Sequence, residues 1–130
     1  MNSLIVTPLF VGILALIQVL LTVVVIVRRA QTHIHWLDGG DQPLMRRIRA
    51  HGNFTETAPM ALLAMAVVEL SGLAPVWLWV GGGVLVGGRG LHAMSLLTNN
   101  AAWSRRGGML STLAVLLGFG LLAILRHWPA

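Results

Sequence analysis

Four long apolar segments divide the chain, and shorter polar stretches separate them. Residues 4–27 are almost uninterrupted by polar side chains, and further apolar stretches fall within residues 44–70, 76–97 and 107–125. About 20 helical residues, each adding about 1.5 Å, cross the roughly 30 Å hydrocarbon layer of a bilayer. The pattern predicts four transmembrane helices, at about 4–27, 44–70, 76–97 and 107–125, within one membrane domain that occupies residues 1–130.

Composition supports a membrane protein. The chain is 56% hydrophobic and 10% charged, with a mean hydropathy of +0.80, whereas a soluble domain has roughly 25% charged residues. Cysteine is absent, so any reactive thiol would have to arrive with a ligand. We therefore expect an all-α membrane protein, a bundle of four transmembrane helices joined by short loops.

The net charge of +5 comes from nine arginines without any lysine. Six of them flank the two basic connections, and they are Arg28, Arg29, Arg46, Arg47, Arg105 and Arg106. The connection SGLAP between the second and third segments has no charge. The positive-inside rule predicts that the basic connections face the cytoplasm, with both termini on the opposite side of the membrane. The use of arginine without lysine is typical of a GC-rich genome, so we expect a bacterial inner membrane. Arginines at helix ends form no basic stripe, so no nucleic-acid partner is expected.

The stretch RIRAHGNFTETAP, residues 47–59, brings charged and amide side chains up to an apolar segment. At about 100° per residue, one helix face collects several of them. The residues on this face are Arg46, Arg49, Asn53 and Glu56. The same face continues in apolar form at Met60. This gradient is typical of a cavity wall that opens to the cytoplasm and closes towards the bilayer centre.

The third segment supplies Arg89, which residue counting places at about the same depth as Glu56. A charged group in a membrane helix costs at least about 2.5 to 3.5 kcal/mol, and pairing usually compensates. We expect Arg89 to lie level with Glu56, and His92, one turn further, to face the same cavity. Arg46, Arg49 and Arg89 would then face one carboxylate, which indicates an anionic ligand. The alternative is an ion cluster that only holds the second and third helices together.

Glycine is frequent in the third segment, WVGGGVLVGGRG. A phosphate-binding loop would need a preceding strand or a G-K-[ST] ending, and neither is present. Gly83 and Gly87 stand four residues apart, the spacing that lets helix backbones approach closely in lipid. We predict a close helix contact there, within the chain or with another subunit.

Two further groups have modest interpretations. His33 and His35 have no third ligand nearby, so no metal site is expected. Glu69 falls near the far interface, where we expect it to snorkel towards water or contact another subunit.

These motifs resemble those of the MAPEG family, the membrane-associated proteins in eicosanoid and glutathione metabolism. RAHGNFTETAP is similar to the R-A-x-x-N-x-x-E-x-x-P signature of the family's second helix. GGRGLHAMSL resembles its third-helix stretch, and RRGGML resembles the R-x-x-G that opens its fourth helix. The resemblance covers nearly the whole chain. It implies a homotrimer of four-helix subunits that hold glutathione between neighbours near the cytoplasmic side.

The resemblance also implies roles for individual side chains. Glu56 would bind the ammonium group of glutathione and Arg49 a carboxylate, and Arg105 would match the arginine that stabilises the thiolate in catalytic members. The expected ligand-binding residues are Arg46, Arg49, Asn53, Glu56, Arg89 and His92. Glutathione would supply the thiol that the chain lacks, and a small lipophilic substrate could reach it from the membrane lipid.

Three functions follow from these expectations. The first is a glutathione transferase or peroxidase that acts on lipophilic electrophiles. The second is a non-catalytic protein of the same fold that binds a lipid or another anion, and the third, less favoured, is a small multidrug-type transporter. The chain has no tyrosine, Thr57 follows the motif glutamate, and His92 stands where an aromatic residue is common. The sequence therefore leaves open whether the protein is an enzyme.

Overall fold

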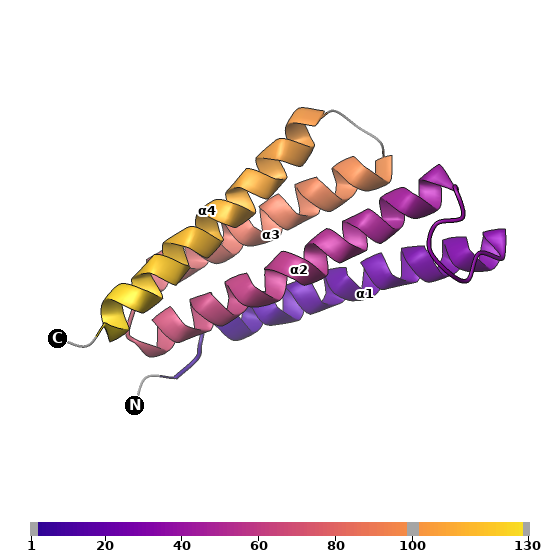
Figure 1. Cartoon of the computed structure of the whole chain (residues 1–130). Coiled ribbons are helices and arrows are strands. Elements are labelled where there is room, and N and C mark those ends of the chain that lie inside the picture. The colour runs from indigo at the N-terminus through magenta and orange to yellow at the C-terminus, as the bar shows by residue number, and fades with distance from the viewer. Residues whose placement is uncertain (1–2, 99–101, 129–130) are drawn as a thin grey trace.

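Four antiparallel helices make up the chain in a computed structural model that describes residues 3–98 and 102–128 (Figure 1). The helices are α1 (Thr7–Thr32), α2 (Gln42–Leu70), α3 (Pro75–Thr98) and α4 (Ala102–His127). Both termini lie at one end of the bundle, which we call the terminal end. The opposite end, where α1 leads into α2, is called the basic end. The expected all-α, four-helix architecture is confirmed.

Helix starts follow local signals in the sequence. The Asp41 carboxylate accepts a hydrogen bond from the backbone N–H of Leu44 at 2.7 Å and so caps α2. Proline occupies the first turns of α1 and α2 and opens α3, where its missing N–H costs no helical bond. Gly72, with φ +80°, turns the chain out of α2. Gly72 and the proline that opens α3 together define the short connection between α2 and α3.

Two helix boundaries differ from the sequence prediction. α1 begins at Thr7 and continues to Thr32 instead of ending at Val27, and α4 begins at Ala102 instead of residue 107. Arg105 therefore lies in an early turn of α4 and not in the connection before it. A helix need not stop where its apolar run stops, because arginine has a high helix propensity and backbone bonds continue into the headgroup layer.

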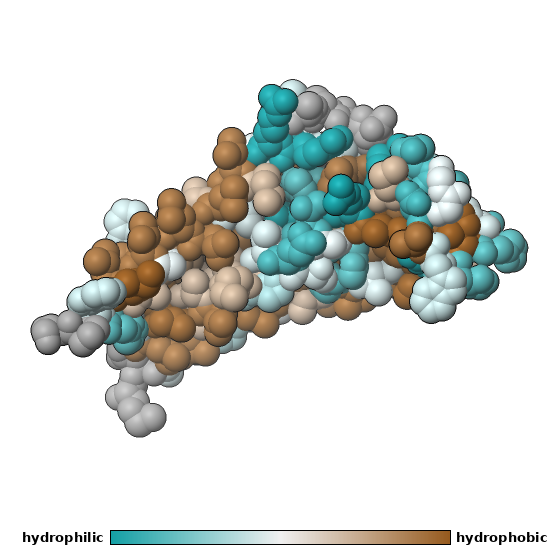
Figure 2. All heavy atoms as spheres, viewed as in Figure 1, coloured by the Kyte–Doolittle hydropathy of each residue, from teal (hydrophilic) through white to brown (hydrophobic). Residues whose placement is uncertain are grey.

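By length and composition alone, the described residues contain two helices able to cross a membrane, α1 and the Trp103–His127 part of α4. α2 packs against each of the other three helices, while α1 and α4 make no contact within the described residues. The fully buried side chains include Leu14, Leu44, Leu78 and Leu85. Figure 2 shows hydrophobic residues over the terminal half and hydrophilic ones gathered towards the basic end. On this face the bundle is mostly apolar in its terminal half and more polar in its basic half.

The closest helix contact uses different glycines from those predicted. A Cβ on Gly83 or Gly87 would meet no atom within 4 Å, so these two face open space in this chain. A Cβ on Gly108 would lie 2.5 Å from the carbonyl oxygen of Gly88 and 2.8 Å from the backbone N of His92. Gly88 and Gly108 therefore let α3 and α4 meet backbone to backbone.

Glu69 closes the terminal end, contrary to the expected snorkelling or subunit contact. Its carboxylate accepts hydrogen bonds from the backbone N–H groups of Ile5, Val6 and Thr7 at 2.7, 2.6 and 2.8 Å. Only 7% of the residue is exposed. The first N–H groups of a helix lack internal partners and carry partial positive charge, so a carboxylate from another helix is a favourable cap.

Candidate functional site

The polar stripe of α2 lies on the outside of this chain. Arg49 and Glu56 are exposed and Asn53 is half-buried, with its side-chain amide donating to the backbone oxygen of Arg49 at 2.9 Å. The buried side of α2 carries Ala50 and Phe54 instead. The helices of a single chain therefore do not enclose the stripe, and the expected cavity is not formed by one chain alone.

Arg89 is fully buried, with 0% of the residue exposed. Its guanidinium donates to the Thr57 hydroxyl at 3.0 Å and lies 5.7 Å from the centre of the Phe54 ring. Glu56 does not pair with it, since the salt bridge within residues 3–98 and 102–128 is that of Arg28 with Asp41. The expected pairing was wrong by one position. Thr57, about 100° further round α2, occupies the side that meets α3.

The remaining polar atoms of Arg89 lack partners among the described residues. Its Nε and Nη2 are buried without a hydrogen bond. A buried cation that contacts only a hydroxyl and an aromatic face is poorly compensated, because transfer of a charge from water is costly unless a counter-charge accompanies it. The position thus carries a positive charge that the described residues do not neutralise.

His92 extends this arrangement towards α4. Its Nδ1 lies 3.0 Å from the backbone oxygen of Arg105. A carbonyl can only accept, so Nδ1 carries the hydrogen, and in the neutral ring Nε2 is an acceptor. That Nε2 is buried without a partner among the described residues. The guanidinium groups of Arg89 and Arg105 both lie near enough to act on this ring electrostatically.

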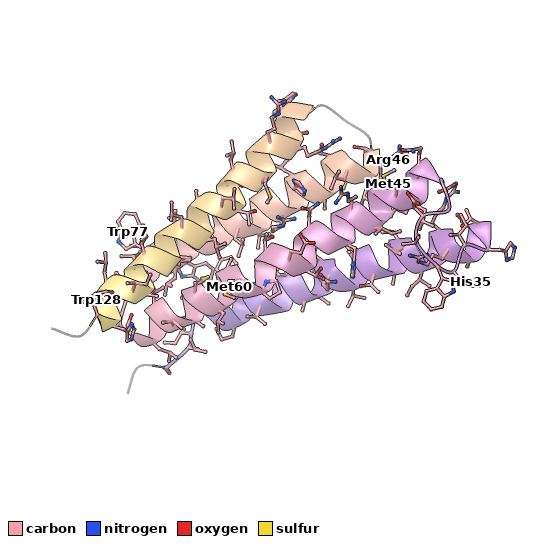
Figure 3. The ribbon with its side chains drawn as sticks, in the orientation of Figure 1. His35, Met45, Arg46, Met60, Trp77 and Trp128 are labelled. Carbon is pink, nitrogen blue, oxygen red and sulfur yellow. The ribbon has the colours of Figure 1, made fainter. Side chains whose placement is uncertain are left out.

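Arg105 and Arg46 complete the group. Each is partly buried, and in each the Nε has no hydrogen-bond partner within the described residues. Figure 3 shows Arg46 on α2 at the basic end. We call Arg46, Arg89, His92 and Arg105 the basic cluster. A hydrogen bond joins His92 to the Arg105 backbone, and Arg89 lies three residues before His92 on α3. Arg49 and Glu56 lie on the exposed stripe of α2 instead.

The Gly88–Gly108 contact positions the cluster. Because the Gly108 Cα sits against the backbone of His92, the first turns of α4 come close enough for the Arg105 carbonyl to reach the imidazole. Neither this glycine pair nor Thr57 was singled out as a site residue from the sequence. The R-x-x-G spacing in RRGGML was the available signal, since Gly108 lies three residues after Arg105.

Comparison with known proteins gives the family. The model of the MAPEG family matches residues 7–125. The chain belongs to the MAPEG family. It is similar to the inner membrane protein YecN of Escherichia coli, in strain K12 and in the O6:H1 strain CFT073. Each comparison shows 35% identity over 89 residues, covering 68% of this chain and 67% of YecN. No solved structure matches the chain.

This MAPEG chain has a second polar contact, between α1 and α2. Gln18 Nε2 lies 2.8 Å from His51 Nε2. Gln18 also lines a groove of about 320 Å³. The groove's other lining residues are Val11, Leu14, Ala15, Phe54, Thr55, Ala58, Pro59 and Leu62. The contact was not foreseen. Its physical role is to give a polar group of each helix a partner inside the membrane region.

The described residues contain no group of three His, Cys, Asp or Glu side chains placed to hold a metal ion. The chemistry available in the basic cluster, with the Thr57 hydroxyl that Arg89 contacts, is that of guanidinium groups, one imidazole and one hydroxyl. Such a set binds anions and stabilises negative charge.

Proposed function

We propose that this MAPEG membrane protein binds glutathione at the basic cluster and the adjoining stripe of α2, as a homotrimer in which a neighbouring subunit completes each site. The observation that carries the proposal is the buried guanidinium of Arg89, with two nitrogen atoms lacking partners among the described residues. The basic end faces the cytoplasm of an inner membrane in this proposal, as the arginine distribution favours.

Glutathione fits the charges that are present. Its two carboxylates and its thiolate form can each accept from a guanidinium, and hydrogen bonds to charged groups contribute about 1.5 to 3 kcal/mol. Arg89, Arg105 and Arg49 are the donors. Its ammonium group needs a carboxylate, and Glu56 is exposed on the same side of α2 as Arg49. Glutathione thus offers anionic groups for the excess arginines and an ammonium group for Glu56.

The exposed stripe supports the oligomer. Glu56 lies 14 residues before the end of α2 at Leu70, or about 21 Å along the helix. That depth falls within a hydrocarbon layer of about 30 Å. An ionised side chain facing lipid there is costly, whereas one facing a neighbouring protein surface can be paired. A second copy of the chain is the partner that the family resemblance implies.

The same groups would favour a reactive thiol. A free thiol has a pKa of about 8.5 and is mostly protonated at neutral pH. Guanidinium groups of Arg105 and Arg89 beside the sulfur would favour its anion, because an opposite charge stabilises the ionised form. The thiolate sulfur would then form a carbon–sulfur bond with a lipophilic electrophile, and the electron pair of the broken bond would leave with the displaced group. The absence of contact between α1 and α4 leaves that side of the bundle open to lipid.

A second candidate is a non-catalytic protein of this fold that binds a lipid or another anion. The observation that favours it is the apolar groove between α1 and α2, which has Gln18 at its edge and the size of a small ligand site. A chain without tyrosine also lacks one hydroxyl donor that could assist a thiol.

The experiment compares thermal unfolding of the purified protein with glutathione, its S-methyl analogue and sulfate. A ligand present at about 100 times its Kd stabilises the folded state by about 2.7 kcal/mol. We expect glutathione to raise the melting temperature most and Arg89→Met to abolish that shift. Arg126→Gln, at the terminal end, is the matched control and should retain it. Equal shifts with glutathione and sulfate would favour the second candidate, and an unchanged shift in Arg89→Met would remove the site assignment.

A further inference from the structure

The connection between α1 and α2 has a defined conformation. Arg29 Nη1 donates to the backbone oxygens of Ile34 and Leu37 at 3.1 and 3.0 Å. Arg28 donates two hydrogen bonds to the Asp41 carboxylate, from Nε at 3.1 Å and from Nη2 at 2.7 Å. Charge-assisted bonds of this kind are stronger than neutral ones and restrict geometry. The two arginines therefore fasten the connection to the end of α1.

This fastened connection holds two large apolar side chains outward. Trp36 is 86% exposed and Leu37 is 82% exposed. Leu37 has a φ of 51°, a left-handed backbone that leucine rarely adopts. Ile34, by contrast, is half-buried and packs against Gly39 of the same connection. The connection thus partly covers one apolar residue and exposes two others, one of them in a disfavoured conformation that the Arg29 bond maintains.

The position along the bilayer normal suggests what meets these side chains. α1 has 26 residues, or about 39 Å. The hydrocarbon layer is about 30 Å thick, and the bilayer including headgroups about 40 to 45 Å. A connection that follows directly after α1 lies at the depth of the headgroups. Tryptophan and arginine both favour this layer, the first through its amphipathic ring and the second through anionic lipids.

We propose that Trp36 and Leu37 form a lipid contact that inserts into the headgroup layer of the leaflet at the basic end and fixes the depth of the α1–α2 pair. The occupant is lipid because the connection lies at headgroup depth and follows an exposed apolar stretch of α1. Ile26 and Val27, near the end of the apolar run of α1, are 58% and 44% exposed. Arginines beside the contact are complementary to anionic phospholipid.

The absence of cysteine provides a direct test. Single-cysteine proteins Trp36→Cys and His35→Cys would carry a nitroxide label in vesicles of phosphatidylethanolamine and phosphatidylglycerol. His35 is exposed on the same connection and is labelled in Figure 3. We expect the label at position 36 to collide several-fold more often with oxygen than with a water-soluble nickel chelate, and the label at 35 to show the reverse. Oxygen concentrates in lipid, so this ratio reports depth.

Two outcomes would overturn the proposal. Equal nickel accessibility at positions 35 and 36 would place Trp36 in water, and protection of position 36 from both reagents would mean that protein covers it. The second variant is Leu37→Asn, combined with the label at 36. Asparagine accepts a left-handed backbone more readily than leucine, so the fold should persist by circular dichroism while the oxygen-to-nickel ratio falls. An unchanged ratio in that variant would show that Leu37 takes no part in insertion.

Discussion

The terminal end and the basic half of the bundle treat their polar groups in opposite ways. At the terminal end, Glu69 receives three backbone hydrogen bonds and Arg126 donates to the backbone oxygen of Ser71 at 2.8 Å. In the basic half, Arg89 and His92 keep buried nitrogen atoms without partners among the described residues. Glu69 and Arg126 thus have their partners within one chain. The basic half is incomplete within one chain, which is what the proposed ligand site requires, since functional sites often give up stability.

Loss of the Glu69 cap at the terminal end should cause the largest change in stability. In Glu69→Ala, three backbone N–H groups at the start of α1 lose their acceptor, and each charged hydrogen bond contributes about 1.5 to 3 kcal/mol. We expect a loss of about 3 kcal/mol or more, measured as the midpoint of chemical unfolding in detergent. Glu69→Gln is the control and should lose less, because it retains one acceptor oxygen. Equal midpoints for wild type and Glu69→Ala would show that the cap is unimportant.

Arg89→Met should raise the stability of the protein, whereas Glu69→Ala should lower it. It replaces a buried, poorly compensated cation with an apolar side chain of similar length, a change that is often neutral or stabilising by about 1 to 4 kcal/mol. We expect a higher melting temperature without ligand, together with lost glutathione binding by calorimetry. A melting temperature well below that of wild type would mean that Arg89 is a structural residue, and the contrast between the two halves would fail.

Gly108→Ala tests how the cluster is positioned. Its new Cβ would press on the backbones of Gly88 and His92, and overpacking of this kind costs about 1 to 3 kcal/mol. Gly107→Ala is a matched control because its Cβ meets nothing within 4 Å, and it should gain up to about 1 kcal/mol from helix propensity. Thermal unfolding of both variants would check this, with glutathione binding measured alongside. If Gly107→Ala and Gly108→Ala changed the melting temperature in the same direction, the close approach of α3 and α4 would be unsupported.

The smallest effect is expected at the basic end, outside the membrane region. The hydrogen bonds from Arg28 hold the pKa of the Asp41 carboxyl below its ordinary value. A group with a lowered folded-state pKa stabilises the protein above its unfolded pKa, about 3.9, and loses this contribution as the pH falls through the folded value. Wild type should therefore be slightly more stable than Asp41→Asn at pH 7, and the difference should shrink as the pH falls below about 3.9 in unfolding measurements. A difference that stayed constant as the pH fell would contradict the ionic explanation.

The helices were predictable from the sequence because apolar segments of membrane length and the prolines at helix starts act locally. The basic character of the site was also predictable, since Arg89 and His92 stood out as polar groups in an apolar segment. Their partners were not. Whether Glu56 or Thr57 faces α3 depends on the rotation of α2, and one position changes the direction by about 100°.

The function of Glu69 could not be predicted for a related reason. Its partners, the backbone groups of Ile5 to Thr7, are more than 60 positions away in the chain, and backbone donors leave no signature in the sequence. Gly88 and Gly108 were hidden among other glycines of α3 and α4. Only packing distinguishes them from Gly83 and Gly87, which stay uncovered in this chain.

The backbone contact of Gly88 with Gly108 also fixes the register of α4. Further along the same pair of helices, a Cβ on Gly81 of α3 would meet the Phe119 ring of α4. The two helices thus meet at two levels, backbone against backbone near the basic cluster and ring against glycine nearer the terminal end. Sliding or rotating α4 would disturb both contacts at once. The position of the Arg105 carbonyl, and with it the tautomer of His92, is therefore set by the register of a whole helix.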